Sequence, residues 1–376
     1  MNETYGIVLP FNYSHSRKPA YQYGWDWGPR LVSAGIWKHA YVRAYSNIRI
    51  DSVLFRTPDV TDTRSVKVLG KVTVDIPQGT PGYPFILTIR DNSTGAVVYQ
   101  SPFLPGQAKQ RRMLQEASGP RGMEDVSFEF DIKNAKLWWT WNLGTPYLYN
   151  FTVQVSSQAN PNQYLDYKTT SVGLRTVKWE QALDGNGFGS SFYAVLNGVP
   201  VYMRGSNYIP PDMFMPRALR NPDVYNKTIQ AAIDGNQNML RLWGGGQYEH
   251  DLFYDMCDAS GILIWHDMMF ACAMYPAEPD MLANIKQETV DNVRRLRNHP
   301  SIALWNGNNE VLIGWEHWGW QDKLNDSQKQ IVFGWYTEIF EVTLREVVAQ
   351  EDPDRFYWPT SPTSQAPGNY SFGDIH

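Results

Sequence analysis

Two amides and a carboxyl stand side by side in this sequence of 376 residues, as Asn308-Asn309-Glu310. They follow residues 301–305, a short apolar run whose branched and aromatic residues are typical of a buried parallel strand. Polar groups after such a strand suit a barrel of parallel strands, where ligands bind at the carboxyl ends. A carboxyl there can act as a general acid or base. The same residues could instead cap and begin a helix.

Other residues with chemical potential form weaker patterns. His266-Asp267 could bind a metal, but neighbouring side chains of a strand point to opposite faces, so we expect no metal site. Cys257 and Cys272 form no CxxC pair, and we expect both to be buried small apolar residues. The three glycines at 244–246 lack the Lys-Ser/Thr of a phosphate loop. The sequence predicts no cofactor.

Composition excludes some classes of function. The net charge is −5 without a basic block, so nucleic acid is not an expected partner. No apolar run approaches the ~18 residues of a membrane span. Aromatic residues make up 14 %, with 15 Trp and 22 Tyr. Aromatic rings stack on the C–H face of sugars, which favours carbohydrate binding, although many of these Trp must fill a core.

The expected elements divide the chain into three parts. Residues 1–46 are too few for a domain and include an alternating stretch, 35–45, that predicts a strand. We expect them to end a β-domain that begins upstream. Residues 47–178 contain about seven short strands, which is typical of an immunoglobulin-like β-sandwich. Within this part, 107–124 is predicted to be an exposed loop, and the Trp residues of 137–149 are predicted to pack inward.

Strands alternate with helices in residues 179–376. A β-hairpin at 192–201 comes first. Strands are then predicted at 202–208, 239–243, 262–267, 302–305, 356–359 and 371–376, with helices at 221–235, 251–260, 281–298 and 328–350. The helix from 221 is expected to have Asn221 as its cap and Pro222 in its first turn. The repetition predicts a parallel sheet and, from its length, an incomplete (β/α)8 TIM barrel with about six of its strands.

Seven motifs, in order and with their spacing kept, resemble those of the β-mannosidases of glycoside hydrolase family 2. They are Gly24-Trp-Asp-Trp-Gly-Pro, Gly35-Ile-Trp, Asn197-Gly-Val-Pro, Arg204-Gly-Ser-Asn-Tyr-Ile-Pro-Pro-Asp, Asn238-Met-Leu-Arg-Leu-Trp-Gly-Gly-Gly, Asn298-His-Pro-Ser-Ile and Gly307-Asn-Asn-Glu. The resemblance covers nearly the whole chain. It implies the end of a jelly-roll sugar-binding domain, an immunoglobulin-like domain and a catalytic TIM barrel, cut at both ends.

The resemblance also implies roles for individual residues. Glu310 matches the general acid/base of these retaining enzymes, which must be protonated to donate to the leaving oxygen. Asn309 matches the residue that holds the sugar 2-hydroxyl. Arg241 is in the place of an Arg that orients the nucleophile, and a salt bridge across the barrel mouth is compatible with that role. The nucleophile itself is a Glu after strand seven, which would lie beyond His376. The later carboxyls are expected in a loop and helix where they cannot replace it: Glu316, Glu338, Glu341 and Glu346.

Aromatic residues of the motifs are implied to line the sugar site. Trp243 and Trp318 match walls around the mannose, although Trp243 could instead anchor the glycine loop. The competing candidates for the place of Trp318 are Trp315 and Trp320. Asp26 matches a residue that reaches into the site from the sugar-binding domain, with Trp25 beside it. Asp26 could instead make an Asx turn before Gly28.

The family implies a retaining exo-β-mannosidase without a cofactor. Its partner would be a β-mannoside oligosaccharide, from which it removes terminal non-reducing β-D-mannose, either in mannooligosaccharides or in ends derived from N-glycans. Two alternatives stay open: a catalytically inert carbohydrate-binding fragment, or another family-2 activity such as β-galactosidase or β-glucuronidase. A homodimer is also left open.

Seven Asn-x-Ser/Thr sequons occur, whereas composition would give roughly three. The excess predicts passage through the secretory route, to the outside or to a lysosome or vacuole. Residues 1–4 begin no signal peptide, so we expect the true N-terminus to lie upstream. The candidate glycosylation sites are Asn2, Asn12, Asn92, Asn150, Asn226, Asn325 and Asn369.

Overall fold

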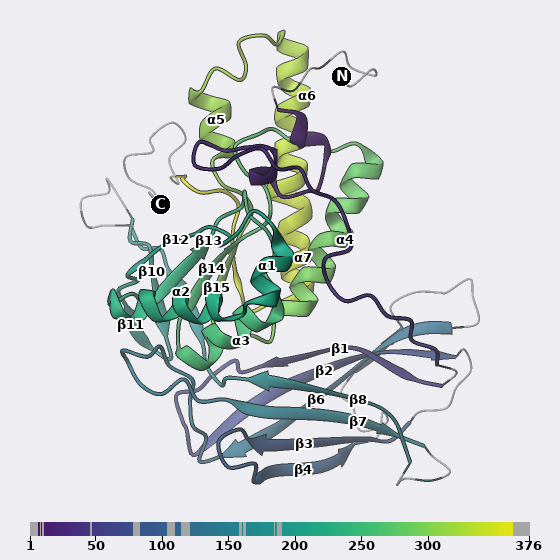
Figure 1. The fold of residues 1–376 in the computed structure, drawn as a ribbon. Helices are drawn as coiled ribbons and strands as arrows, with labels where there is room; N and C mark the ends of the chain where they lie inside the picture. Colours follow the sequence, from purple (N-terminus) through teal and green to yellow (C-terminus); the bar gives the residue numbers. More distant parts are fainter. Residues whose placement is uncertain are drawn as a thin grey trace.

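The computed structural model describes residues 7, 9, 11–45, 47–77, 83–103, 110–113, 121–157, 160, 163–183, 185 and 190–363. Figure 1 shows an antiparallel β-sandwich beneath a parallel sheet that helices cover. The N-terminal segment crosses the helical part before it descends to the sandwich (Figure 1). The described chain is therefore mostly β, with an α/β portion built on a parallel sheet.

Two four-stranded antiparallel sheets form the sandwich. The first has the order β1 (Arg49–Arg56), β2 (Ser65–Pro77), β6 (Arg121–Lys133), β5 (Gln110–Met113), and the second β4 (Val97–Phe103), β3 (Phe85–Asp91), β7 (Tyr149–Ser156), β8 (Tyr164–Val172). Alternate residues of β7 are buried, as the apolar alternation of its sequence requires. Val68, Leu87 and Phe151 belong to the core between the sheets. Whether the sandwich is immunoglobulin-like stays a prediction.

Two sequence predictions in this half are wrong. The expected exposed loop at 107–124 contains β5 and the start of β6, because a polar stretch can still pair through its backbone at the edge of a sheet. The expected strand at 35–45 has no strand conformation. Ile36 is 85 % and Val42 99 % exposed, so these two apolar side chains are not packed in the core of a sheet. Before this stretch, the segment forms two short 3₁₀ helices, η1 (Asn12–His15) and η2 (Ala20–Tyr23).

A small three-stranded sheet closes the lower end of the α/β part. The predicted hairpin is present as β10 (Tyr193–Leu196) and β11 (Val199–Val201), and β10 also pairs with β9 (Val177–Glu180). Both turn residues, Asn197 and Gly198, have positive φ, which a two-residue hairpin loop favours. Apolar residues of these strands pack with Met239, Leu263 and Ala303 at the amino ends of the large sheet. That end is therefore packed, which leaves the carboxyl ends for ligands.

The parallel sheet has five strands in sequence order. They are β12 (Gly205–Tyr208), β13 (Met239–Leu242), β14 (Leu263–Asp267), β15 (Ile302–Asn306) and β16 (Phe356–Trp358). Every residue of β13 and β15 is buried, as expected for parallel strands covered on both faces. The sixth predicted strand, 371–376, lies outside the described residues. Closure into an eight-stranded barrel therefore stays a prediction.

Helices alternate with these strands. The predicted helices are present as α2 (Asp223–Asp234), α3 (Asp251–Ser260), α4 (Pro279–Leu296) and a last one made of α6 (Asp326–Tyr336), a π-helical segment (Thr337–Thr343) and α7 (Leu344–Glu351). One short helix, α1 (Met215–Arg220), was not predicted, and another, α5 (Val311–His317), begins where a helix start was the alternative interpretation of residues 308–310. The predicted Asn221 cap is wrong, because Pro222 directly precedes α2 and only the carbonyl of Asn221 accepts a bond, from Val224 N. Within the described ranges, no helix combines the length and the apolar character that crossing a membrane requires.

Side chains from both halves join the sandwich to the α/β part. The predicted inward Trp138 is fully buried, but it packs under the parallel sheet, where its Nε1 donates to Asp258 O at 2.8 Å. The buried Arg297 donates to Glu351 Oε2 at 2.8 Å and to Ser52 Oγ at 3.2 Å. Asn298 Nδ2 donates to Val53 O at 2.9 Å. The residues just before β15 therefore hold the sandwich and the sheet in one packed unit.

Candidate active site

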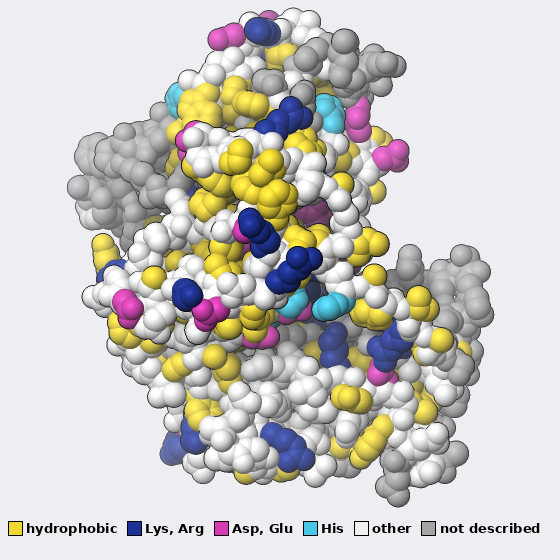
Figure 2. Space-filling model, viewed as in Figure 1, with side chains coloured by type: hydrophobic (Ala, Val, Ile, Leu, Met, Phe, Trp, Pro, Cys, Tyr) yellow, Lys and Arg dark blue, Asp and Glu magenta, His cyan; other side chains and the backbone are white. Residues whose placement is uncertain are grey.

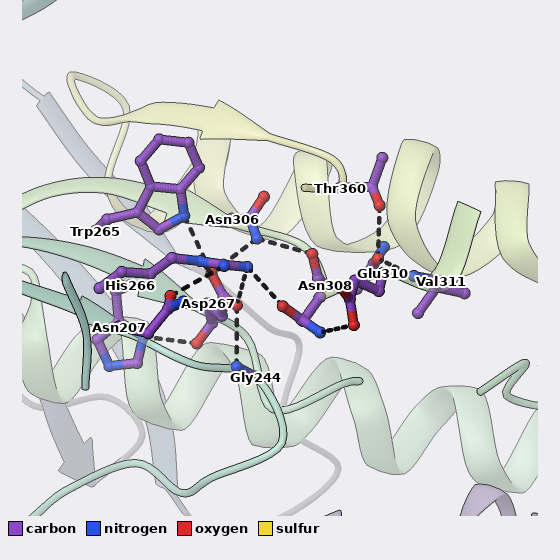
Figure 3. A network of polar contacts seen from close by, with 12 residues as sticks. Asn207, Gly244, Trp265, His266, Asp267, Asn306, Asn308, Glu310, Val311 and Thr360 are labelled. Carbon is purple, nitrogen blue, oxygen red and sulfur yellow. Dashed lines mark hydrogen bonds and ion pairs between the residues drawn. The ribbon is translucent and has the colours of Figure 1, made fainter. Parts of the chain in front are cut away.

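Polar side chains meet where the parallel strands end (Figure 3). Arg241 comes from β13 and Asp267 from β14, and both are buried. Their ion pair is bidentate, with Arg241 Nη2 2.9 Å from Asp267 Oδ2 and Nε 3.2 Å from Oδ1. The salt bridge across the sheet that the sequence allowed for Arg241 is thus present. Asp267 was considered only as half of a metal pair, so its role as the partner of Arg241 was missed.

Asp267 is saturated with donors. Gly244 N donates to Oδ2 at 2.9 Å, while Trp265 Nε1 and Asn306 Nδ2 donate to Oδ1 at 3.1 and 2.8 Å (Figure 3). A buried carboxyl group that accepts this many hydrogen bonds is held in one position. It holds Arg241 and the first glycine of the 244–246 loop in place. These contacts suit Asp267 to a supporting role, in which it keeps other residues of the site in position.

Arg241 also connects Asp267 to the residues that follow β15. Its Nη2 also donates to Asn309 Oδ1 at 2.9 Å, and its Nη1 donates to Asn207 Oδ1 at 3.2 Å. Because the amide oxygen of Asn309 faces Arg241, its nitrogen faces Glu310, and Nδ2 donates to Glu310 Oε2 at 3.0 Å. A chain of contacts therefore runs from Asp267 through Arg241 and Asn309 to Glu310. The structure thus brings together the three predicted residues Arg241, Asn309 and Glu310.

Glu310 lies both after a strand and before a helix. It directly precedes α5, and the Oδ1 of Asn308 accepts from Val311 N at 3.1 Å and from Thr360 Oγ1 at 2.6 Å (Figure 3). The helix-start alternative is therefore correct as well, with Asn308 as the residue that bonds the helix. Glu310 itself has φ +59°, and its N–H donates to Ser361 O at 2.8 Å. A left-handed backbone at a non-glycine residue costs on the order of 1 kcal/mol and is often found at functional sites.

Cys272 also contacts Glu310, with Sγ 3.1 Å from Oε2. The prediction of a buried small apolar residue is therefore wrong for Cys272, which is partly exposed, and right for Cys257, which is buried. Burial and the neighbouring Glu310 raise the pKa of the Cys272 thiol, so it stays protonated. Only the fold could reveal this contact, because Cys272 and Glu310 are 38 positions apart.

An open cavity of about 490 Å³ lies beside Cys272. Trp25 and Asp26 line it, together with Phe11, Tyr13, Tyr23, Gly24 and Arg30. Two backbone hydrogen bonds between Trp25 and Gly28 close a tight turn, and Asp26 stands exposed at its tip. Trp25 and Asp26 therefore share a cavity with a direct neighbour of Glu310. The turn is closed by the backbone, and no hydrogen bond from Gly28 N to the Asp26 carboxylate is present between these two described residues, so the alternative of an Asx turn is wrong. The backbone turn presents Asp26 to the cavity.

The candidate aromatic walls differ in exposure. Trp243 is buried, its ring meets that of Trp25 edge-on at 4.8 Å, and it covers Gly245 so closely that a Cβ there would lie 2.0 Å from it. Trp243 is thus an anchor of the glycine loop that also backs the cavity. Trp318 is 47 % exposed, whereas Trp315 is buried. The third candidate, Trp320, packs edge-on against both Trp318 and Phe11. Trp318 is therefore the most available ring of the three.

Two groups of side chains that could bind a metal, His266 with Asp267 and a cluster on α3 and before β15, are not part of the lining of this cavity. His266 and Asp267 point to opposite faces, since His266 Nε2 meets Tyr254 OH at 2.8 Å while Asp267 meets Arg241. Burial lowers the pKa of His266 to about 3, so it is neutral. Asp255, Asp258 and His299 also cluster, at the other end of the sheet. There, Asp258 bonds His299 Nδ1 at 2.6 Å and Ser301 N at 3.0 Å, which ties the start of β15 to α3.

The sequons lie on different surfaces. Asn92, Asn226 and Asn325 are exposed. Asn150 is half-buried, and its Nδ2 donates to Asn92 Oδ1 at 2.6 Å. The predictions at Asn2 and Asn369, and the side chain of Asn12, lie outside what the structure describes. Glycosylation at any of them stays a prediction.

Comparison with known proteins gives the geometry a context. A family described as "Glycosyl hydrolases family 2" matches residues 48–175, and one described as "Glycosyl hydrolase 2 galactose-binding domain-like" matches residues 4–38. The chain is 34 % identical over 367 residues to β-mannosidase B of Aspergillus clavatus and 32 % identical over 392 residues to β-mannosidase of Mus musculus. Each alignment covers 96 % of this chain and 40 % of the relative, so the chain spans less than half of their length.

The fold agrees with these matches. The crystal structure of a β-D-mannosidase from Dictyoglomus thermophilum superposes with a TM-score of 0.82 and 30 % identity, covering 99 % of this chain and 42 % of that one. The likeness includes the sandwich, the parallel sheet and the segment that carries Trp25 and Asp26. The chain belongs to glycosyl hydrolase family 2, and within that family it resembles the β-mannosidases.

Proposed function

We propose that the protein to which this chain belongs is a retaining exo-β-mannosidase, with Glu310 as its general acid/base. The observation that carries the proposal is the Asn309–Glu310 pair, which Arg241 holds after β15 and which contacts Cys272 in the wall of an aromatic-lined cavity. The similarity to β-mannosidases over 96 % of the chain supports the substrate class. The proposal keeps the division into residues 1–46, 47–178 and 179–376, with the last part belonging to a closed barrel.

The proposed reaction has two steps. In the first, protonated Glu310 donates to the glycosidic oxygen as its bond to the anomeric carbon breaks, and a second carboxylate about 5–5.5 Å away attacks that carbon. In the second, the Glu310 carboxylate takes a proton from water, which displaces the enzyme and releases mannose. Asn309 holds the 2-hydroxyl, a contact that strengthens in the transition state. Arg241 keeps Asn309 and the acid/base aligned.

The walls of the cavity favour action at a chain end. Asp26 stands at the tip of a turn that faces the cavity, with Trp25 and Trp243 packed edge-on behind it. Such a turn would contact the terminal sugar and block a further residue on that side. Trp318 would offer a stacking face on another side. Terminal, non-reducing β-D-mannose is therefore the proposed substrate unit.

Glu310→Gln tests the assignment in the protein expressed at the full length of its relatives. A mannoside with a very good leaving group should still form the glycosyl-enzyme, because its departure needs little acid. A mannoside with a poor leaving group should react about 10²–10⁴-fold more slowly. The intermediate should accumulate, and azide, which needs no base, should restore turnover and give β-mannosyl azide. Glu316→Gln, on the exposed side of α5, is the matched control and should change neither step.

Equal losses on good and poor leaving groups, without azide rescue, would show that another carboxyl is the acid/base. The sugar specificity has its own test, a panel of 4-nitrophenyl β-glycosides. Preference for the galactoside or glucuronide would replace mannosidase by another family-2 activity. If no glycoside were cleaved but mannose were bound, the protein would be a carbohydrate-binding one.

We also propose that the protein passes through the secretory route. The support is the number of sequons and the exposure of Asn92, Asn226 and Asn325. Treatment of the native protein with an endoglycosidase should lower its mass. An unchanged mass would remove the support for this localisation.

A further inference from the structure

Two donors converge on one oxygen of Glu310. Asn309 Nδ2 lies 3.0 Å and Cys272 Sγ 3.1 Å from Oε2. The same thiol also accepts from Asn309 Nδ2 at 3.4 Å, so thiol, amide and carboxyl form a closed triangle. Hydrogen bonds to an ionised carboxylate favour that ionised form. The triangle therefore places two donors on one carboxyl oxygen of the candidate acid/base.

The backbone places the thiol without help from its side chain. After β14, Asn309 N donates to Phe270 O and Cys272 N donates to Asn309 O, each at 2.9 Å, so strand pairing continues beyond the ends of β14 and β15. Tyr13 OH donates to Cys272 O at 3.1 Å from the N-terminal segment. Cys272 itself has φ +47°. A backbone held in this uncommon conformation from both sides fixes where Sγ lies.

The surroundings keep the thiol neutral. Burial raises the pKa of Cys272 far above its ordinary value, and the charge of Glu310 raises it further. Among the described residues, the charged and titratable groups near the pair include Arg241 from β13, which acts through Asn309. They also include Tyr13, whose hydroxyl donates to Cys272 O, Tyr275 in the segment after β14, and Asp26 and Arg30, which line the cavity together with Cys272. Cys272 is therefore a hydrogen-bond donor, and neither a nucleophile nor an ion.

We propose that Cys272 is a positioning residue for the acid/base: its thiol donates to Oε2, so that the exchangeable proton is carried on Oε1. The inference rests on the proposed role of Glu310. In the first step the Oε1–H bond breaks, its proton goes to the glycosidic oxygen, and the bonding electrons remain on Glu310 as a carboxylate that the S–H group stabilises. In the second step a proton from water returns to Oε1. The thiol keeps its own proton throughout.

The test uses the full-length protein and the pH dependence of kcat/KM. The alkaline limb of this profile reports the loss of the proton from the acid. Cys272→Ala removes a donor to the carboxylate, so this limb should move to higher pH by about 0.5–1 unit. Cys272→Ser retains a donor and should restore the limb of the parent protein. Cys257→Ala, which removes a buried thiol elsewhere, is the matched control and should leave the limb in place.

Cys272→Gly guards against a variant that fails to fold, because the positive φ suits glycine and the thiol is again removed. It should shift the limb as Cys272→Ala does. An unchanged limb in the Ala and Gly variants, or a Ser variant that behaves like them, would overturn the inference. Its failure can be separated from failure of the proposed function: Glu310→Gln would still depend on the leaving group and respond to azide if only the role of Cys272 were wrong.

Discussion

The sandwich and the upper end of the parallel sheet are both buried, but they are held together in opposite ways. The sandwich interior is apolar, and Phe151 there lies 4.7 Å from Phe55 and 5.9 Å from Phe130, measured between ring centroids. The sheet end instead buries Arg241, Asp267 and Asn309 together. Apolar contacts tolerate small shifts, whereas a buried charge is stable only if its partners stay in place. The side chains of the site must therefore keep fixed positions relative to one another, whereas the apolar core of the sandwich does not require this.

Asp267→Ala should break the site most severely. It leaves the Arg241 guanidinium buried without its ion pair and leaves Gly244 N without its acceptor, so the free energy of unfolding should fall by about 3–5 kcal/mol. Activity should fall as well, because Asn309 loses its orientation. Urea unfolding and kcat/KM per folded molecule measure the two effects. Unchanged activity in the folded fraction would show that Arg241 does not align the site.

Phe151→Ala should destabilise the sandwich by about 3–5 kcal/mol, because it opens a cavity in a fully buried part of the core. In contrast to the variant of Asp267, kcat/KM per folded molecule should stay that of the parent protein. Urea unfolding followed by tryptophan fluorescence, with activity measured well below the midpoint, checks both halves of the expectation. A loss of activity would mean that the sandwich shapes the site.

Trp318→Ala should have the opposite effect to Phe151→Ala, with stability nearly unchanged and substrate binding weakened. The ring is 47 % exposed, so the free energy of unfolding should change by less than about 0.5 kcal/mol. The loss of a stacking face should raise KM for mannosides several-fold. Trp315→Ala is the matched comparison: its ring is buried and stacks on Phe333, so stability should fall. If KM did not change in Trp318→Ala, the sugar wall would have to be sought elsewhere.

The smallest effect is expected at His299, at the packed end of the sheet. Burial alone would lower the pKa of His299, but attraction to Asp258 and a hydrogen bond with it raise the pKa above its ordinary value. The stabilisation from this pair is complete below the unfolded pKa of about 6.5 and is lost as pH rises through the higher folded pKa. The melting temperature should therefore fall more between pH 5.5 and 8.5 in the parent protein than in His299→Gln. Parallel slopes would contradict the assignment.

The contrast between the apolar sandwich and the polar site also explains which features could be predicted from the sequence. Alternating patterns predicted that residues 47–178 form a β-sandwich, although not every strand of it, and largely apolar runs predicted β13, β14 and β15, because each pattern records which faces are buried. The stretch 35–45 failed since alternation requires a partner strand, which no local pattern specifies. The start of α5 was recognised only as an alternative to the strand end, because the helix begins directly after the strand-like run and the two interpretations of residues 308–310 overlap in sequence.

For the site, the motifs identified the residues but not their contacts. Arg241, Asn309 and Glu310 were singled out, and the structure places them in contact. The thiol of Cys272 was assigned to the core, because nothing local distinguishes a buried cysteine from one beside a carboxyl. Asp26 was located from its motif alone, while its approach to the cavity depends on a turn packed against Trp243. Such long-range contacts follow from the fold as a whole.

The buried guanidinium of Arg297 affects how the protein unfolds. Arg297, just after α4, bonds Glu351 at the end of α7 and Ser52 in β1. If the sandwich unfolded alone, Arg297 would stay in the α/β part and lose its bonds to Ser52 and Val53, and if the α/β part unfolded alone the sandwich would lose the same bonds. Independent melting of the halves is therefore suppressed. Heating should therefore give one cooperative transition. The boundary between the sandwich and the sheet should also resist motion of one half relative to the other.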